Sequence, residues 1–439
     1  MSSPLSPALS HPFPSVPSLT LAELYGKDGL SAASARVKKL KDEFFEHFSE
    51  HPDYLFSAPG RTEIGGNHTD HQNGCVLCGS VDLDMLCFVK ANGTKEVRLY
   101  SEQFPPVICD ISKARPDESE FGKSDALIKG VAAALREKGY EISGFDGMMT
   151  SRIPAGMGLS SSAAFETLVG TVFSALFCSG EISPVDLAKA GKYAEQTFFG
   201  KPCGLMDQIG CGVGGCVFVD FKKEQSPKIE NISIDFSKLG LVPCVINTRS
   251  GHSDLTDDYA AIRNEMEQIA SHFGKDKLRF VESKDFYDRL PLLRKKYGDR
   301  AVLRAMHFFD ENERARAEFN ALKNGDKDLF LDLVNRSGRS SESCLENIWS
   351  IKDEKNQAAQ FTIALCRRLL NGEGAVRIHG GGFGGTVQAF VPIERFDGFK
   401  RSVDEVLSPG SCCRILIRKV GGCLLTDAEQ PIGSAVINK

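Results

Sequence analysis

The sequence predicts a protein of the α+β class, in which helices and mixed sheets are divided between more than one domain. The chain has 439 residues, of which 41% are hydrophobic, and this length is enough for two or three domains with large cores. Segments whose apolar residues recur at helical spacing alternate with segments rich in strand-forming residues. Together the two patterns indicate a mixed fold.

The first part of the chain predicts one helix and two strands. Residues 30–51 carry apolar side chains at helical spacing and predict a charged amphipathic helix. The segment LFSAPG at 55–60 predicts a short strand, and residues 75–90 are rich enough in strand formers to be a strand or a hairpin. We therefore expect the polar residues 61–74 to connect two strands.

A strand, a glycine loop and a helix follow one another after a second predicted helix at 126–138. Residues 145–153 predict the strand, and the run IPAGMGLSSSAA at 153–164 predicts the loop and a helix that begins near Ser160. Small loop residues let the backbone approach a polyphosphate, and the helix N-terminus favours its negative charge. The serines can cap the helix, hold phosphate oxygens or bind magnesium. Because the spacing is not that of the common P-loop, an ordinary capped helix is the alternative.

The next predicted helix has clear signals at both ends. Ser183 is suited to be its N-cap, Gly200 ends it, and Glu195 lies in its last two turns. Beyond it, Asp207 lies in a turn bracketed by glycines that leads into a strand at 217–221. Taken alone, Glu195 would be a solvated helix charge and Asp207 a turn aspartate.

The polar segment 224–238 is the predicted domain boundary. It divides the chain into a flexible N-terminal tail (1–19), an N-terminal domain (20–235) and a C-terminal domain (236–439). The C-terminal domain begins with a strand at 242–247 and continues with helical segments at 259–273 and 303–323, with one more before a strand-flanked glycine cluster at 380–385.

The composition excludes several classes of partner. The 53 basic and 58 acidic residues give a net charge of −5, so the chain has no excess of positive charge that would attract nucleic acid or an anionic membrane. No apolar stretch is long enough to cross a bilayer. The 14 cysteines lie largely in apolar runs and follow no secretory signal, so we expect a reduced, cytoplasmic protein that acts on small molecules.

The polar segment APGRTEIGGNHTDHQNG at 58–74 concentrates chemically active side chains. It holds Arg61, His68, Asp70 and His71 among small residues. One interpretation is a metal site, since the histidines and the aspartate offer donors at short spacing. Another is recognition of a polyhydroxylated substrate, with Arg61 aimed at phosphate, and a third is a purely structural polar turn. With the phosphate loop and Asp207, the second interpretation describes a small-molecule kinase.

Five segments of the chain carry a resemblance to a known family. APGRTEIGGNHTDHQNG is similar to a sugar-binding signature, PAGMGLSSSAA to a phosphate loop and RIHGGGFGGTVQAFV to a third motif; AEQTFFGKPCGLMDQ and HFFDENERARAEFNALKNGD are weaker matches. The region from about residue 50 to residue 395 thereby resembles the galactokinase family of the GHMP kinase superfamily. The resemblance implies a two-domain GHMP kinase-like architecture with the active site in the interdomain cleft.

The resemblance also implies roles for individual residues. Asp207 would face the anomeric hydroxyl as the catalytic aspartate, and Arg61 would stabilise the transferring phosphoryl group and help to set the ionisation of Asp207. The positions that match sugar-binding residues are Asn67, His68, Thr69, Asp70, Gly204 and Tyr259. Those that match the ATP phosphate loop are Gly156, Met157, Gly158, Leu159, Ser160, Ser161 and Ser162, and those that match magnesium ligands are Ser162 and Glu195.

The activity implied is transfer of the γ-phosphoryl group of ATP, with magnesium, to the C1 hydroxyl of galactose by a monomer or weak oligomer. Two positions depart from the family pattern: Asn67 replaces a glutamate and His71 a tyrosine. These departures leave another free sugar, such as L-arabinose or N-acetylgalactosamine, as an alternative substrate. A non-catalytic sensor of sugar and ATP is a second alternative, and a metal-dependent hydrolase that uses His68, Asp70 and His71 is a third.

Overall fold

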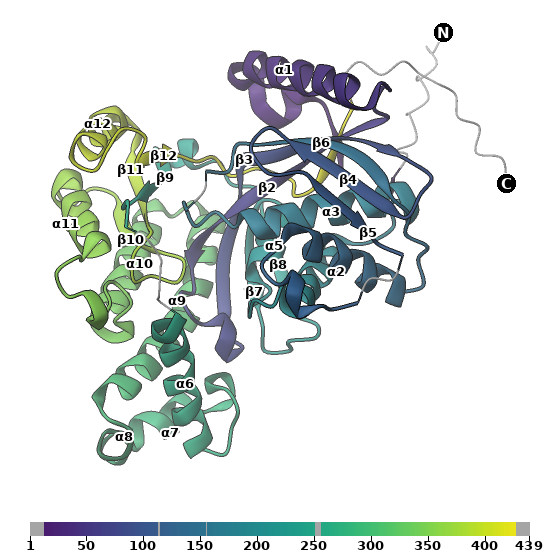
Figure 1. The fold of residues 1–439 in the computed structure, drawn as a ribbon. Coiled ribbons are helices and arrows are strands. Elements are labelled where there is room, and N and C mark those ends of the chain that lie inside the picture. The colour runs from purple at the N-terminus through teal and green to yellow at the C-terminus, as the bar shows by residue number, and fades with distance from the viewer. Residues whose placement is uncertain (1–12, 113–114, 155, 251–255, 427–439) are drawn as a thin grey trace, which may run out of the picture.

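The computed structural model describes residues 13–112, 115–154, 156–250 and 256–426. Two sheets organise this part of the chain (Figure 1). The large sheet has nine strands in the described residues, in the order β1-β13-β2-β3-β6-β4-β5, with β7 paired to β3 and β8 to β7. The small sheet has four, in the order β10-β11-β9-β12.

Most of the large sheet and its helices come from the first half of the chain. These elements are β1 (Ser18–Leu19), α1 (Leu21–Phe48), β2 (Tyr54–Gly65), β3 (Cys75–Ala91), β4 (Glu96–Ser101), β5 (Val107–Asp110), α2 (Ser124–Glu137), β6 (Phe145–Ser151), α3 (Ser161–Phe177), α4 (Pro184–Tyr193), α5 (Met206–Gly212), β7 (Cys216–Asp220) and β8 (Lys228–Ile232).

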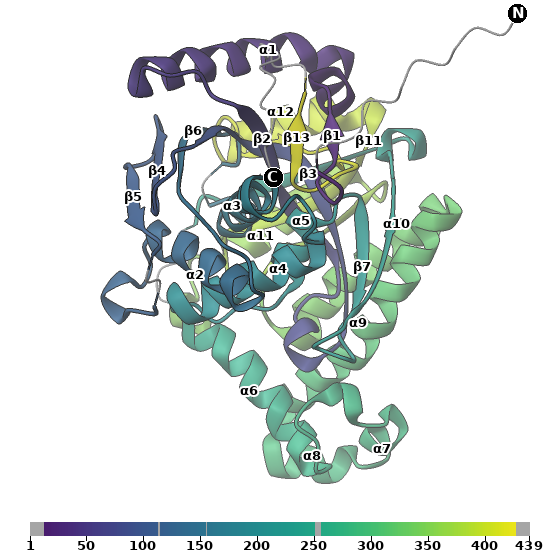
Figure 2. The ribbon, with the colours of Figure 1, turned by 90° about the vertical axis from the view of Figure 1, so that its right-hand side faces the viewer.

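The second half supplies the small sheet, a helical subdomain and one returning strand. Its elements are β9 (Leu241–Asn247), α6 (Thr256–His272), α7 (Ser283–Asp288), α8 (Leu290–Tyr297), α9 (Asp299–Asn324), α10 (Lys327–Ser340), α11 (Ala358–Leu370), β10 (Ala375–His379), β11 (Thr386–Pro392), α12 (Phe396–Val406), β12 (Cys412–Arg414) and β13 (Cys423–Leu425). Figure 2 shows α6, α7 and α8 projecting together from the end of the molecule opposite α1.

Strand alternation explains how the large sheet buries both of its faces. Leu55, Leu86 and Met148 point to one face and pack with the apolar residues of α1. Their neighbours in sequence, such as Phe56 and Cys87, point to the other face and join the core with α2 and α3. The centre of the sheet therefore lies between α1 and a layer of helices, and β2, β3 and β6 are apolar on both sides.

The predicted helices and strands match the structure in most places, with a longer first helix. The helix predicted at 30–51 begins at Leu21, where the Thr20 and Glu23 side chains form a capping box. Ser183 caps α4 as predicted, accepting from the backbone N–H of Asp186 at 3.1 Å. Residues 75–91 form a single strand.

Two local predictions were wrong. Residues 61–65, expected in a connector, are the second half of β2 and pair with β3 across two register shifts. Their polar side chains resemble a loop in sequence because their partners lie far along the chain, as His379 does for Thr62 at 3.0 Å. Asp207, expected in a turn, lies in the first turn of α5.

The two ends of the described chain pack on the large sheet. Part of the predicted tail, residues 1–12, lies outside the described residues, but Phe13 and Val16 are buried and β1 pairs with β13. β13 in turn pairs with β2, so the chain returns to the large sheet after completing the small one. The domain division at residue 236 stays a prediction. No helix of the described ranges is long and apolar enough to span a membrane.

Asp84 of β3 is bonded to three other segments below the surface, namely α1, β2 and the C-terminal segment around Arg418. Its fully buried carboxylate accepts hydrogen bonds from Tyr25 at 2.5 Å, Ser57 at 2.6 Å and Arg36 at 2.6 Å, and Arg418 lies 3.3 Å away. Burial alone would raise the pKa of Asp84, but the charges of the two arginines outweigh it and hold the pKa below its usual value. The carboxylate thus fixes α1 and the C-terminal segment to the sheet.

Substitution of Asp84 by alanine is expected to lower the free energy of unfolding by about 3–5 kcal/mol, because it leaves buried arginine charge uncompensated. Urea unfolding followed by circular dichroism measures the change. Asp42→Ala is the control. The Asp42 side chain is 58% exposed, so its ion pair with Lys38 should contribute almost nothing to the free energy of unfolding. Equal effects of the two substitutions would contradict the role assigned to Asp84.

Candidate active site

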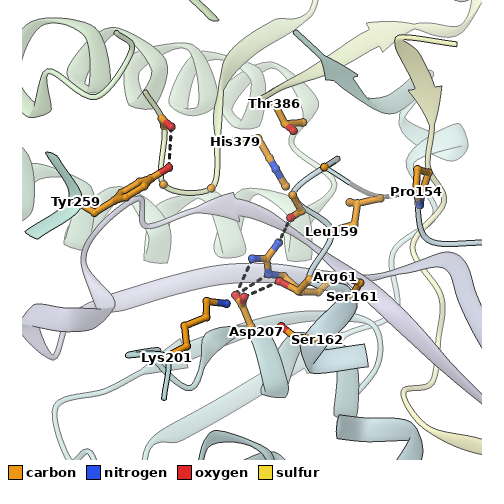
Figure 3. A pocket seen from close by; sticks show the side chains of 16 residues that line it. Arg61, Pro154, Leu159, Ser161, Ser162, Lys201, Asp207, Tyr259, His379 and Thr386 are labelled. Atoms are coloured by element: carbon orange, nitrogen blue, oxygen red, sulfur yellow. Dashed lines mark hydrogen bonds and ion pairs between the residues drawn. The ribbon is translucent and has the colours of Figure 1, made fainter. Parts of the chain in front are cut away.

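A cavity of about 280 Å³ lies between the large sheet and the glycine turn that joins β10 to β11 (Figure 3). Segments from both halves of the chain form its wall. The lining residues are Arg61, Pro154, Gly156, Gly158, Leu159, Ser160, Ser161, Ser162, Lys201, Asp207, Tyr259, His379, Gly380, Gly381, Gly382 and Thr386.

The predicted phosphate loop faces this cavity with its backbone. Gly156 and Gly158 are exposed and have φ of 72° and 65°, a left-handed conformation that glycine adopts without strain. Met157 and Leu159 are 3% and 1% exposed and anchor the loop in the core. Met157 accordingly does not line the cavity, whereas the other predicted loop residues do. Ala155, in the same predicted run, lies outside the described residues.

The loop leads directly into the N-terminus of α3. This helix begins at Ser161, so the unpaired backbone N–H groups of its first turn and its positive dipole end lie at the cavity. Ser160 precedes the helix but does not cap it with its side chain. Its hydroxyl instead donates to Oδ2 of Asp207 at 2.5 Å. The loop and the helix end together form an anion-binding surface.

Arg61 and Asp207 form an ion pair at the floor of the cavity. Arg61 lies on β2, and its Nε and Nη2 atoms lie 2.8 and 2.7 Å from Oδ1 of Asp207 on α5. A third guanidinium nitrogen, Nη1, donates to the carbonyl of Gly158 at 2.5 Å. The Arg61 side chain is only 7% exposed and is fixed by these contacts. One guanidinium therefore holds the strand, the helix and the phosphate loop together.

The charge of Arg61 also controls the protonation of Asp207. Burial by itself would raise the pKa of Asp207. The charge of Arg61 and the hydrogen bonds from Ser160 and Arg61 outweigh burial, so the pKa lies below its usual value. Asp207 is consequently a carboxylate throughout the neutral pH range.

Glu195 lies behind the phosphate loop in a π-helical turn, Ala194–Phe198, that extends α4. Its Oε1 accepts from Ser162 Oγ at 3.1 Å and from Lys201 Nζ at 2.8 Å, and its Oε2 accepts from Gln208 at 2.8 Å. The π turn is a common feature of functional sites and sets the direction of this carboxylate. Hydroxyl and carboxylate oxygens are hard donors of the kind magnesium takes, and magnesium keeps further positions for water and phosphate. The two predicted metal ligands therefore fit that ion.

The predicted sugar residues differ in how close they lie to the cavity. Of the six, only Tyr259 lines it, and its hydroxyl donates to the carbonyl of Gly382 at 3.1 Å. His68 Nε2 lies 2.9 Å from the carbonyl of Gly381, another lining residue. A Cβ added to Gly204 would lie 2.2 Å from Oδ2 of Asp70, so the carboxylate of Asp70 rests on the glycine backbone.

Asn67 and Thr69 lie behind the cavity wall, which differs from the sequence-based expectation. Asn67 is 1% exposed; its amide donates to Glu63 at 2.9 Å and to the carbonyl of Gly380 at 2.6 Å. Thr69 is fully buried, with its hydroxyl between the carbonyls of Gly66 and Cys75. Both side chains are occupied in holding the loop that carries His68 and Asp70.

His68 and His71 do not form a metal site with Asp70. Their ring nitrogens lie 3.4 Å apart and face each other, and Asp70 accepts from the backbone N–H of His71 at 2.8 Å. Within the described ranges, no group of three histidine, cysteine, aspartate or glutamate side chains could hold a metal ion. The geometry gives the hydrolase alternative no support.

Sequence reasoning missed three side chains that line the cavity: Lys201, His379 and Thr386. The Glu63 backbone N–H donates to Nε2 of His379 at 3.1 Å, so the neutral ring carries its proton on Nδ1. In the described part of the chain, that nitrogen has no hydrogen-bond partner and faces Gly158. The motif HGGGFGGT marked this turn in the sequence, but its contact with the phosphate loop depends on the pairing of distant segments.

Comparisons with known families and relatives agree on one assignment. The family model described as GHMP kinases N terminal domain matches residues 126–215, and the galactokinase galactose-binding signature matches residues 42–91. The chain is 30% identical over 375 residues to a galactokinase of Glaesserella parasuis, covering 84% of this chain and 93% of that protein. It is also 30% identical over 380 residues to a galactokinase of Enterococcus faecalis, covering 83% and 92%.

Solved structures confirm the predicted fold class. The Lactococcus lactis galactokinase complexed with galactose matches with a TM-score of 0.75 at 23% identity, covering 88% of this chain and 99% of that chain. The mevalonate kinase of Methanococcus jannaschii matches with a TM-score of 0.57 at 16% identity, covering 83% and 98%. At these identities the matches establish the architecture.

The partly buried His68 predicts a loss of stability in mild acid. Burial lowers the pKa of His68 to about 4, below the value of about 6.5 for an unfolded chain. Between these two pH values the unfolded chain binds a proton that the folded protein does not, so stability falls as pH falls from about 6.5 to 4.

His68→Asn is expected to reduce this loss, since asparagine tolerates the φ of 58° at this position and does not titrate. Urea unfolding of the two proteins at several pH values between 7.5 and 4.5 measures it. An identical pH dependence for wild type and variant would contradict the burial of a neutral His68.

Proposed function

The chain belongs to the galactokinase family of the GHMP kinases, and from this premise we propose that it transfers the γ-phosphoryl group of ATP to the C1 hydroxyl of galactose. The products are galactose 1-phosphate and ADP. The observation that carries the proposal is the Arg61–Asp207 ion pair, set beside a phosphate loop and a helix N-terminus in one cavity. Phosphoryl transfer to a hydroxyl requires a carboxylate that can accept the hydroxyl proton and a surface that binds the phosphates. Asp207 is the first, and the phosphate loop with the helix N-terminus is the second.

The phosphates of ATP would lie on the backbone of the loop and on the first turn of α3. The exposed Gly156 and Gly158 leave room for close approach, and Ser161 lies at the helix N-terminus. Ser162 and Glu195 would hold the magnesium ion, which neutralises phosphate charge when bound. Arg61 would stabilise negative charge on the transferring group, since its guanidinium already lies at the cavity floor.

Asp207 would orient the attacking hydroxyl and receive its proton. In the reaction the C1 oxygen forms a bond to the γ-phosphorus, the bond from that phosphorus to the bridging oxygen of ADP breaks, and the hydroxyl proton passes to Asp207. Its low pKa makes Asp207 a weak base. We therefore assign it mainly to orientation and electrostatics, with proton transfer accompanying formation of the new bond.

The sugar would bind at the end of the cavity near Tyr259. Asp70 and His68 lie next to this end, and the loop that holds them is fixed by the buried side chains of Asn67 and Thr69. We propose that Asn67 positions this loop and does not read a sugar hydroxyl itself. The net charge of −5 supports action without nucleic acid or membrane partners, and we propose a cytoplasmic monomer or weak oligomer.

A panel of free sugars tests the substrate assignment. ADP release with ATP and magnesium is expected to be fastest with galactose and slower with L-arabinose and N-acetylgalactosamine. Faster turnover with either alternative would keep the mechanism and replace galactose as the substrate. Galactose and ATP binding without any turnover would favour the sensor instead.

Asp207→Asn is expected to lower kcat by about 10²–10⁴-fold, the range that general acid–base groups contribute. Stopped assays of galactose-dependent ADP formation measure it, and calorimetry shows whether galactose still binds. Asp186→Asn is a matched control, because Asp186 also lies in the first turn of a helix but not in the cavity wall. Wild-type turnover in the Asp207 variant would remove its assigned role.

A further inference from the structure

We propose that the ammonium group of Lys201 occupies the position beside Ser162 and Glu195 that a divalent metal ion would take. The metal ion must displace this ammonium group. The displaced ammonium then contacts the phosphates of the nucleotide. This inference rests on the proposed function, since that function places magnesium on Ser162 and Glu195. In this proposal the site has two protein cations. Lys201 moves between two positions, whereas Arg61 is held in place.

Lys201 and Ser162 both contact one oxygen atom of Glu195, Oε1. Lys201 Nζ lies 2.8 Å from Oε1 of Glu195, and Ser162 Oγ lies 3.1 Å from the same atom. The other carboxylate oxygen is occupied, because Gln208 donates to Oε2 at 2.8 Å. A metal ion bound by Ser162 and Glu195 must therefore reach Oε1, where the ammonium already lies. Two cations at one oxygen repel each other, so the metal and the ammonium compete.

The two partners of the Lys201–Glu195 ion pair are unequally buried. The Glu195 side chain is 2% exposed, whereas that of Lys201 is 55% exposed. Gln208 also donates to Glu166 at 3.0 Å, which fixes the carboxylate from behind. The acid is thus immobile, and the base is a flexible four-carbon chain at the cavity surface. Only the lysine is free to move.

Departure of the ammonium requires a replacement. Ser162 and Gln208 are neutral donors, and a buried carboxylate without a compensating cation is strongly unfavourable, so Lys201 leaves Glu195 only when another cation arrives. The backbone of Lys201 stays in place, because its N–H donates to the carbonyl of Glu195 at 3.0 Å. The exchange therefore involves side-chain rotation alone and is coupled to metal binding.

The displaced ammonium of Lys201 has a destination within the same cavity. Lys201 lines the same cavity as the phosphate loop and the N-terminus of α3. Figure 3 shows its side chain extending toward Asp207. Arg61, by contrast, is 7% exposed and is held by Asp207 and the Gly158 carbonyl. Lys201 is consequently the cation able to follow the phosphates.

Lys201→Met separates the two halves of the proposal. Without the competing ammonium, Mn²⁺ should bind the nucleotide-free protein at least about tenfold more tightly, the size of effect expected for one charged hydrogen bond. Without the phosphate contact, magnesium ATP should bind at least about tenfold more weakly in the absence of sugar. Electron paramagnetic resonance of free Mn²⁺ measures the first, and isothermal titration calorimetry measures the second.

Three controls keep the result unambiguous. Lys201→Arg retains the cation and should change both affinities much less. Lys90→Met removes a lysine with the same 2.8 Å separation from a glutamate, Glu50, outside the cavity wall and should change neither. Thermal unfolding by circular dichroism checks that each variant is folded.

Unchanged or weaker Mn²⁺ binding by the methionine variant would overturn the competition. Unchanged or tighter nucleotide binding would overturn the phosphate contact. Both measurements are made without sugar, so they succeed or fail independently of which sugar, if any, the protein phosphorylates.

Discussion

The ion pair between Arg61 and Asp207 is the interaction on which the rest of the site depends. It joins β2 to the first turn of α5, and the same guanidinium holds the Gly158 carbonyl of the phosphate loop. The Arg61 side chain is 7% exposed and that of Asp207 30%, and an ion pair so far withdrawn from water needs hydrogen bonds at its remaining polar atoms. Ser160 supplies one at the second oxygen of Asp207. The acceptor carboxylate and the phosphate-binding backbone are therefore positioned by one side chain.

The small sheet closes this site through contacts that cross between the two halves of the chain. His379 at the end of β10 lies 3.0 Å from Thr62, the neighbour of Arg61 on β2, and Gln388 of β11 donates to the same hydroxyl at 2.7 Å. Burial and the charges of Arg61 and Arg377 hold the pKa of His379 well below its usual value, so the bridge is neutral. The site thus combines a fixed cation at Arg61, a neutral wall and a mobile cation at Lys201.

Local patterns in the sequence predicted much of the fold. Apolar spacing located α1 and α2, and the signals at Ser183 located the start of α4. The run at 153–164 indicated a phosphate loop and a helix start, because these depend on residues close together in the chain, whereas the role of Asp207 came from the family resemblance alone. Side chains whose partners lie far away could not be placed in this way. Asn67 accepts a hydrogen bond from Asn347 at 2.8 Å, and Thr62 is hydrogen-bonded to His379. Each partner is about three hundred positions away, so the sequence did not show that these polar residues are buried, and they resembled a binding loop. Lys201 gave no signal, since its role depends on its contact with Glu195 at 2.8 Å and on its place in the cavity wall, which only the folded chain brings about.

The most direct test of the central claim is the position of phosphate in the product. Phosphorus and carbon nuclear magnetic resonance of a reaction with ATP, magnesium and galactose should show a single sugar phosphate, with the phosphorus coupled to C1. This result follows if Asp207 orients the anomeric hydroxyl toward the phosphate loop. Phosphate on any other carbon, or formation of ADP and inorganic phosphate without a sugar phosphate, would contradict the account.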